Sequence, residues 1–158
     1  MANRLREAVK AELYPFLKVR GFEQLKSQHS QFTFFTKRHA SQTLVLFIQW
    51  DKYGRESFVL NLSRIPGDSD VKKLGPFDVE WMARLQPSGS SPRWWKTRKP
   101  LLAALTTFRL RYEPSEVVGQ VVGAFGQAER WWERGEVGSH IQPSALPPNK
   151  SLERTREA

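Results

Sequence analysis

The sequence predicts one α+β domain, in which an antiparallel sheet of about four strands is packed against an N-terminal and a C-terminal helix. Two amphipathic helix patterns enclose a middle region of strand character, and the strands are joined by short connections. Short connections are typical of antiparallel neighbours. The end of the chain is almost free of apolar residues. We therefore expect a folded domain over 2–136 and a disordered tail over 137–158.

The first helix is predicted from apolar residues that recur at three- and four-residue steps, beginning with Leu5, Val9 and Leu13. Charged residues occupy the other side of this segment. Pro15 lacks a backbone N–H, so it is expected to kink or end the helix. Gly21 then supplies a residue that can adopt the left-handed conformation at the helix end.

Four segments have strand character. Residues 31–37 are rich in Phe and Thr, 43–50 form a nearly continuous apolar run, and 57–65 alternate between two faces. The central run is typical of a strand buried on both sides. These three segments predict an antiparallel meander. Residues 77–85 alternate most regularly, with apolar side chains at every second position, and predict a fourth strand.

The segment 100–112 is ambiguous. Its leucines suit a helix with Pro100 at the first position, whereas Thr106, Phe108 and Leu110 suit a strand. We favour the helix.

The second long helix is predicted over 115–134. Ser115 is a suitable N-cap and Gly135 a suitable terminator. Glycines inside a helix destabilise it relative to alanine. We therefore expect Gly119, Gly123 and Gly126 to mark a close packing contact.

The formal net charge is +9, since 25 Lys and Arg face 16 Asp and Glu. This balance favours polyanionic partners. Residues 81–112 contain no acid, and basic side chains there flank two tryptophans that could stack on unpaired bases. The candidate binding residues, which include one tryptophan at the end of the second helix, are Arg84, Arg93, Trp94, Trp95, Lys96, Arg98, Lys99 and Trp132.

The same basic and aromatic residues could instead have only a structural role, and this alternative stays open. One tryptophan could pack in the core while the charges form a solvated rim. Adjacent residues of an extended segment point to opposite faces, so at most one of Trp94 and Trp95 is expected in the core. Likewise, if one of Trp131 and Trp132 packs on the sheet, the other is expected to be exposed as an anchor for a partner.

Enzyme signatures are sparse. The chain has no cysteine, and its three histidines lack metal-ligand spacing. No serine elbow or phosphate loop is present. Asp51 with Asp70 and Lys72 resembles a nuclease metal site only weakly. Asp78 and Glu80 would share one strand face, which more often is a solvated edge. We expect no catalytic residue, metal or cofactor.

Several short motifs occur in a suggestive order. They are Gly21-Phe22, a strand ending in Gln49, a strand containing Asn61, Arg84-Leu85 and Trp94-Trp95. This order resembles a small bacterial family catalogued only as a domain of unknown function, over roughly residues 5–135. The resemblance implies a small α+β domain and assigns no activity or catalytic residue.

The sequence thus predicts a non-catalytic binding or interaction protein of the bacterial cytoplasm. Its expected partner is an unidentified protein or a polyanion, and no membrane partner is expected. The alternatives are a nucleic-acid-binding module that uses the 84–111 stretch and, third, a metal-dependent nuclease.

Overall fold

The computed structural model describes residues 3–26, 29–75, 78–89 and 91–144. Its helical segments are α1 (Arg4–Ala8), the π-helical η1 (Val9–Leu13), α2 (Tyr14–Val19), the 3-10 turn η2 (Val71–Lys73), α3 (Leu101–Thr107) and α4 (Pro114–Arg134). Its strands are β1 (Glu23–Gln24), β2 (Phe32–His39), β3 (Gln42–Trp50), β4 (Ser57–Pro66), β5 (Ala83–Leu85), β6 (Trp95–Lys96) and β7 (Ile141–Pro143).

Within the described residues, seven strands form one antiparallel sheet in the order β1-β2-β3-β4-β5-β7, with β6 also pairing with β4. The α+β class and the β2–β3–β4 meander are confirmed. The expected count of about four strands is wrong. Strands β1, β6 and β7 have only two or three residues each, so they carry no periodic pattern that a sequence could reveal.

The predicted strand over 77–85 is largely wrong. Only Ala83–Leu85 pairs as β5, and 78–82 form a coil. Val79 in this coil is buried against Phe34, Val45 and Phe47 on the sheet. The alternation therefore reflects a loop that packs its apolar side chains on the sheet, which produces the same period of two as a strand. Phe77 lies outside the described residues.

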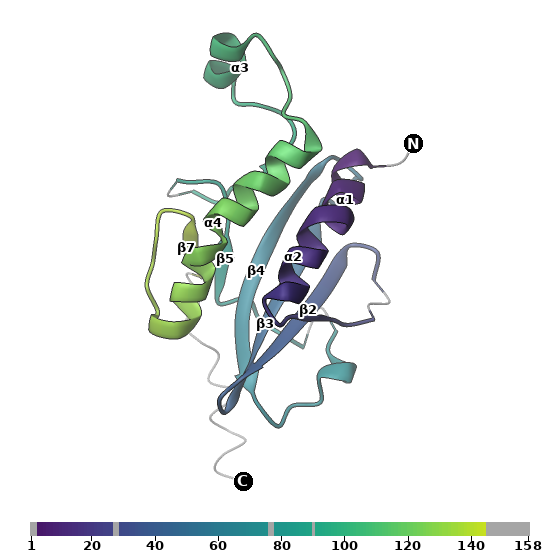
Figure 1. The fold of residues 1–158 in the computed structure, drawn as a ribbon, viewed down its shortest axis with the longest axis vertical. Helices are drawn as coiled ribbons and strands as arrows, with labels where there is room; N and C mark the ends of the chain where they lie inside the picture. Colours follow the sequence, from purple (N-terminus) through teal and green to yellow (C-terminus); the bar gives the residue numbers. More distant parts are fainter. Residues whose placement is uncertain (1–2, 27–28, 76–77, 90, 145–158) are drawn as a thin grey trace.

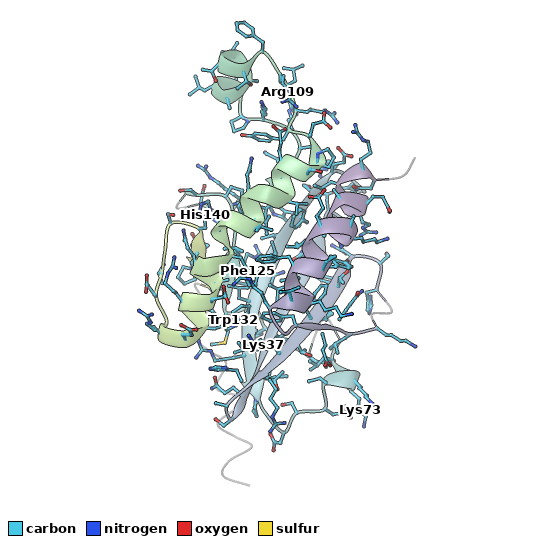
Figure 2. All side chains as sticks on the ribbon, in the orientation of Figure 1. Lys37, Lys73, Arg109, Phe125, Trp132 and His140 are labelled. Atoms are coloured by element: carbon cyan, nitrogen blue, oxygen red, sulfur yellow. The ribbon has the colours of Figure 1, made fainter. Side chains whose placement is uncertain are left out.

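The main core lies between the sheet and the helical segments α1, η1, α2 and α4, which cover one face of the sheet (Figure 1). The even-numbered residues of β3 and β4 point into it, and Leu46, Ile48 and Leu60 are fully buried there. Phe125 and Trp132 of α4 face the N-terminal helical segment across this core (Figure 2). The burial of apolar surface here is the main source of stability.

The N-terminal helix passes Pro15 without a break. The backbone N–H of Tyr14 bonds to the carbonyl of Val9 in the π-helical turn η1, which widens the helix just before the proline. Such single-turn π segments are typical accommodations of local strain. Gly21 ends the helix with φ of 89°, as predicted.

Helix α4 begins earlier than the sequence predicted. Glu113 is its N-cap, and Glu113 and Glu116 form a reciprocal capping box. Ser115 is therefore not the cap, and its hydroxyl instead donates to Glu12 at 2.6 Å. Gly135 ends the helix with φ of 69°, as predicted.

The folded part continues beyond residue 136, where the predicted tail began. Strand β7 pairs with β5, with Arg84 opposite Gln142. The preceding turn is fixed by Gln127 of α4, whose side-chain oxygen accepts from the His140 backbone at 2.7 Å. The rest of the predicted tail, 145–158, lies outside the described residues.

The helix favoured within 100–112 is confirmed for Leu101–Thr107, although Pro100 is its N-cap and not its first residue. This helix lies apart from the sheet and the other helices (Figure 1). Among the described residues, none of the helices has the length and apolar character required to cross a membrane.

The glycines of α4 do not mark a close contact. A Cβ built at Gly119 or Gly123 meets nothing within 4 Å, and one built at Gly126 meets only the Nη1 of Arg130, on the same helix, at 3.4 Å. The expected close contact with another element is therefore wrong.

Replacing Gly119 or Gly123 by alanine should raise the free energy of unfolding by about 0.5–1 kcal/mol, because the unfolded chain loses freedom. Urea unfolding measures this. Gly135→Ala is the matched control and should lower stability, because its φ of 69° is strained for alanine. A loss of stability in Gly119→Ala would contradict the prediction.

Candidate functional site

The candidate site lies on the face of the sheet that the helices leave open. Odd-numbered residues of β3 and β4 point to this face, because alternate residues of a strand point to opposite sides. In the register, Asn61 of β4 lies between Phe47 of β3 and Arg84 of β5. Gln49 of β3 lies one pleat further along and is paired with Phe32 of β2.

Three polar side chains form a hydrogen-bonded network there. The Arg84 Nε donates to the Asn61 Oδ1 at 2.8 Å. The Gln49 Oε1 accepts from the Asn61 Nδ2 at 3.3 Å and from an Arg84 Nη at 3.5 Å. Asn61 is fully buried, so these bonds supply the partners that its amide needs. Because the oxygen of Gln49 is occupied twice, its amino group is left as a donor.

The guanidinium of Arg84 is covered on one face by Trp81, whose ring centroid lies 4.2 Å from the Arg84 Cζ. Burial lowers the pKa of Arg84, since desolvation disfavours its charged form. Arginine nevertheless keeps its proton in proteins. Among the described residues, Arg84 takes part in no ion pair, and its fixed partners are two neutral amides and an indole.

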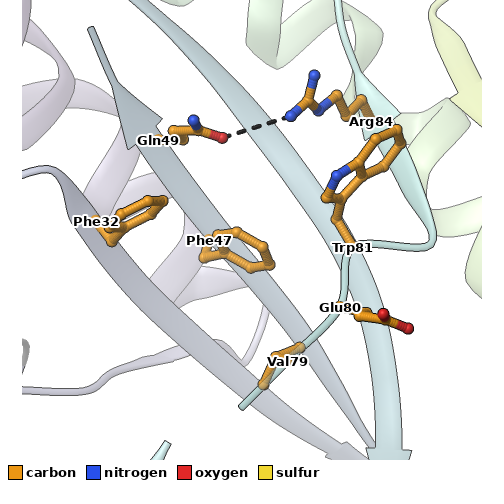
Figure 3. A pocket seen from close by; sticks show the side chains of 7 residues that line it. All are labelled: Phe32, Phe47, Gln49, Val79, Glu80, Trp81 and Arg84. Carbon is orange, nitrogen blue, oxygen red and sulfur yellow. Dashed lines mark hydrogen bonds between the residues drawn. The ribbon is translucent and has the colours of Figure 1, made fainter. Parts of the chain in front are cut away.

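A pocket of about 380 Å³ opens beside this network. It is lined by Phe32, Phe47, Gln49, Val79, Glu80, Trp81 and Arg84. Phe32 and Phe47 lie on one side of it, with Trp81 and Arg84 on the other (Figure 3). The pocket thus combines an apolar floor with a few polar groups, among them the charged Arg84 and the exposed carboxylate of Glu80. Such a mixture is usual for a small-molecule site.

Arg84 is the only predicted site residue that lines this pocket. Trp95 is buried, and its indole N–H donates to the Leu85 carbonyl at 3.0 Å. Trp94 is half-buried, so the expectation that at most one of the pair lies in the core is confirmed. Lys99 is buried and donates to the Thr107 hydroxyl at 2.8 Å.

The other basic candidates are exposed but dispersed. Arg93 donates to the carbonyl of Ser88 at 2.9 Å. Lys96 lies on the short strand β6, opposite Ser57, and Arg98 bridges to Arg111 at the base of α3.

Trp132 also lies in the core. Its indole N–H donates to the Ser63 carbonyl at 2.9 Å. Trp131 is buried as well, so the expectation that one of the two is exposed is wrong. Adjacent residues differ by about 100° around a helix, and both fit within the wide buried stripe of α4.

The carboxylates considered for a nuclease are far apart. Asp51 follows the end of β3, while Asp70 lies in the segment that follows the opposite end of the β3–β4 pair. These two ends are about 25 Å apart at the usual strand rise. Partial desolvation acts to raise the pKa of Asp51, but hydrogen bonds from Tyr53 and Arg55 outweigh it and hold that pKa below its ordinary value. Asp51 is thus a turn-forming carboxylate.

The remaining acidic candidates also have local roles. Asp70 accepts from the backbone N–H of Lys72 and caps η2. Asp78 accepts from the Gly75 N–H at 2.7 Å, and its coil does not form the strand face that Asp78 and Glu80 were expected to share. No group of three or more metal-ligating side chains occurs in the described part of the chain.

Sequence reasoning did not identify Phe32, Trp81, Gln49 and Asn61 as one site. One signal in the sequence could have revealed two of them, because Gln49 and Asn61 are each a polar residue within an otherwise apolar strand. Gln49, Asn61 and Arg84 each lie in one of the short motifs noted in the sequence, and the structure joins their side chains by hydrogen bonds.

Comparison of the chain with models of protein families, with curated proteins and with solved structures gives no match. The interpretation of the site therefore depends on its own geometry.

Gln49→Glu tests whether Arg84 lacks a counter-ion. The substitution keeps the shape of the side chain and places a carboxylate beside the guanidinium, so at pH 7 it should raise the free energy of unfolding by about 1 kcal/mol. Arg84 would lower the folded-state pKa of the new carboxyl. The gain should therefore be present above the unfolded pKa of about 4.3 and be lost as the pH falls through the folded value.

Urea unfolding at neutral and acidic pH measures this effect. Gln24→Glu, on the exposed strand β1, is the matched control and should change little. If Gln49→Glu and Gln24→Glu change the free energy of unfolding by the same amount at both pH values, the prediction that Arg84 lacks a counter-ion is wrong.

Proposed function

We propose that the protein is a non-catalytic binding domain whose open sheet face binds a small organic anion through Arg84. The observation that carries this proposal is the half-buried guanidinium with no carboxylate partner among the described residues. A charge removed from water is unfavourable unless hydrogen bonds or a counter-ion compensate it. Two neutral amides and an indole compensate it in part, and a bound anion would complete the compensation.

The donor groups of Arg84 and Gln49 select an acceptor. Glu80 also lines the pocket, but its carboxylate is exposed and takes part in none of the ion pairs among the described residues. Arg84 retains N–H groups at Nη that no described residue accepts, and the amino group of Gln49 lies on the same network. A group that presents only oxygen acceptors, such as a carboxylate, matches these donors. The hydrogen bonds between an arginine and a carboxylate are charge-assisted and often paired in one plane, which makes them among the strongest in proteins.

The apolar lining adds a second requirement. Phe32, Phe47 and Val79 provide a hydrophobic floor next to the donors, and Trp81 provides an aromatic wall. The ligand we expect is therefore a carboxylate attached to an aromatic or branched hydrocarbon group. The volume of about 380 Å³ suits such a molecule.

The distribution of the basic stretch gives less support to the nucleic-acid alternative. A single-stranded nucleic acid needs a continuous basic groove with exposed stacking rings. Trp95 and Lys99 are buried, while Arg109 and Arg111 are engaged with Glu113, Glu116 and Glu56. The separation of Asp51 from Asp70 likewise gives no support to the nuclease alternative.

Titration with phenylacetate and with its neutral isostere phenylacetamide tests the proposal. The carboxylate should bind and shift the NMR signals of the Arg84, Gln49 and Asn61 side chains. The amide should bind at least about tenfold more weakly, because it cannot neutralise the guanidinium. Inorganic phosphate, added separately, shows whether an anion without a hydrocarbon group suffices.

Arg84→Gln should abolish the preference for the acid over the amide. Arg130→Gln is the matched control, because Arg130 is exposed on α4 and pairs with Glu136. Gln49→Glu keeps Arg84 and should also lose binding, since its own carboxylate occupies the donors. Equal affinity for acid and amide, or salt-sensitive retention of mixed-sequence DNA or RNA without any carboxylate binding, would overturn the proposal.

A further inference from the structure

The segment between β6 and α4 forms a projection, here called the arm, that comprises residues 99–110 and contains α3. It extends beyond the end of α4 (Figure 1). Its large apolar side chains are among the most exposed of the described residues. They are Leu101 (74% exposed), Leu102 (78%), Leu105 (63%), Phe108 (95%) and Leu110 (77%).

The arm is held in shape by hydrogen bonds at its base. The Lys99 N–H donates to the Leu110 carbonyl at 3.0 Å, and the Tyr112 N–H donates to the Thr97 carbonyl at 2.7 Å. Inside the arm, Lys99 Nζ donates to the Thr107 hydroxyl at 2.8 Å. These bonds close the two ends of the arm together, so its apolar side chains are presented outward by an ordered backbone (Figure 2).

Phe108 ends α3 with φ of 54°, a left-handed conformation that glycine or asparagine adopts more easily. Its ring is almost fully exposed and so adds little packing within the chain. The fold alone would favour glycine at this position. A bulky aromatic residue there is better explained by a contact outside the chain.

The surroundings of the arm are basic. Residues 81–112 contain no acid, and Lys96 and Arg98 at the base of the arm take part in none of the ion pairs among the described residues. Arg109 and Arg111 also lie at the base, but they pair with Glu113, Glu116 and Glu56. The cationic excess at the base therefore comes from Lys96, Arg98 and Lys99. The arm thus has an apolar tip above a cationic base.

We infer that the arm docks on the surface of an anionic lipid bilayer, with its leucines and Phe108 inserted among the acyl chains. A bilayer surface offers hydrocarbon beneath a layer of negative charge, which matches an apolar tip above a cationic base. The sequence alone had led us to expect no membrane partner. The exposed arm is the observation that changes this expectation.

The arrangement of the apolar side chains favours a bilayer over a groove on a protein. Leu101 and Leu102 are consecutive and point about 100° apart, and Leu110 lies on the segment that returns from α3. A groove covers one face of a helix, whereas a lipid surface surrounds an inserted tip.

A second copy of the chain is a weaker candidate for the occupant. Stable interfaces use about 20–30 residues on each side, and the arm offers five large apolar side chains. Two arms would also bring their cationic bases together, and like charges repel. The inference rests on the arm alone and does not depend on the Arg84 pocket.

Co-sedimentation of the full chain with vesicles tests the inference. Vesicles of phosphatidylcholine with about 30% phosphatidylglycerol should pellet the protein, and pure phosphatidylcholine should not. Added salt should weaken the binding. The double variant Leu102→Ser with Leu105→Ser should lose at least about tenfold in affinity, because two inserted side chains are removed.

The matched control carries Val19→Ser and Tyr53→Ser, since these residues are 89% and 70% exposed elsewhere on the surface. It should bind like the wild type. Arg84→Gln should also bind like the wild type, so that failure of this inference and failure of the proposed function are separable.

Insertion can be measured directly because the chain has no cysteine. In Phe108→Cys, labelled with a polarity-sensitive fluorophore, the emission should shift to the blue on anionic vesicles. Tyr53→Cys, labelled in the same way, should not shift.

Three outcomes would overturn the inference. They are a lack of binding to anionic vesicles at low salt, binding without a shift of the label at residue 108, and equal binding by the leucine double variant. Self-association that the leucine double variant abolishes, without vesicle binding, would assign the arm to a second copy.

Discussion

The pairing register of β2, β3 and β4 determines which side chains lie on each face of the sheet. Because neighbouring residues of a strand point to opposite faces, one register places the even-numbered residues of β3 and β4 beneath the helices and the odd-numbered ones on the open face. A slip by one residue would move Gln49 and Asn61 into the apolar core and expose Ile48 and Leu60. The core and the polar network therefore depend on the same hydrogen-bond ladder.

The sequence predicted those parts of the fold that repeat over enough residues. The two long helices, the meander and the ends at Gly21 and Gly135 follow from local pattern and backbone preference. The short strands β1, β6 and β7 depend on long-range pairing that leaves no periodic trace. The candidate site was predicted only through Arg84, because β5 and the preceding coil bring it to Gln49 and Asn61 from a distant part of the chain.

The open face shows how a polar group can be kept within a largely apolar sheet. Asn61 is fully buried and has its hydrogen bonds satisfied, so it stabilises the position of Arg84 without neutralising it. Trp81 covers one face of the guanidinium and leaves its outer edge available. A more stable protein would place a carboxylate here, and the neutral amides instead leave the charge for a ligand.

The pairing of β7 with β5 also has a consequence for synthesis on the ribosome. Strand β7 follows α4 in the chain, so the outer edge of β5 stays unpaired until residues 141–143 have emerged. An unpaired strand edge can associate with another nascent chain. We therefore expect β7, the last strand among the described residues, to protect the newly made protein from aggregation as well as to extend its sheet.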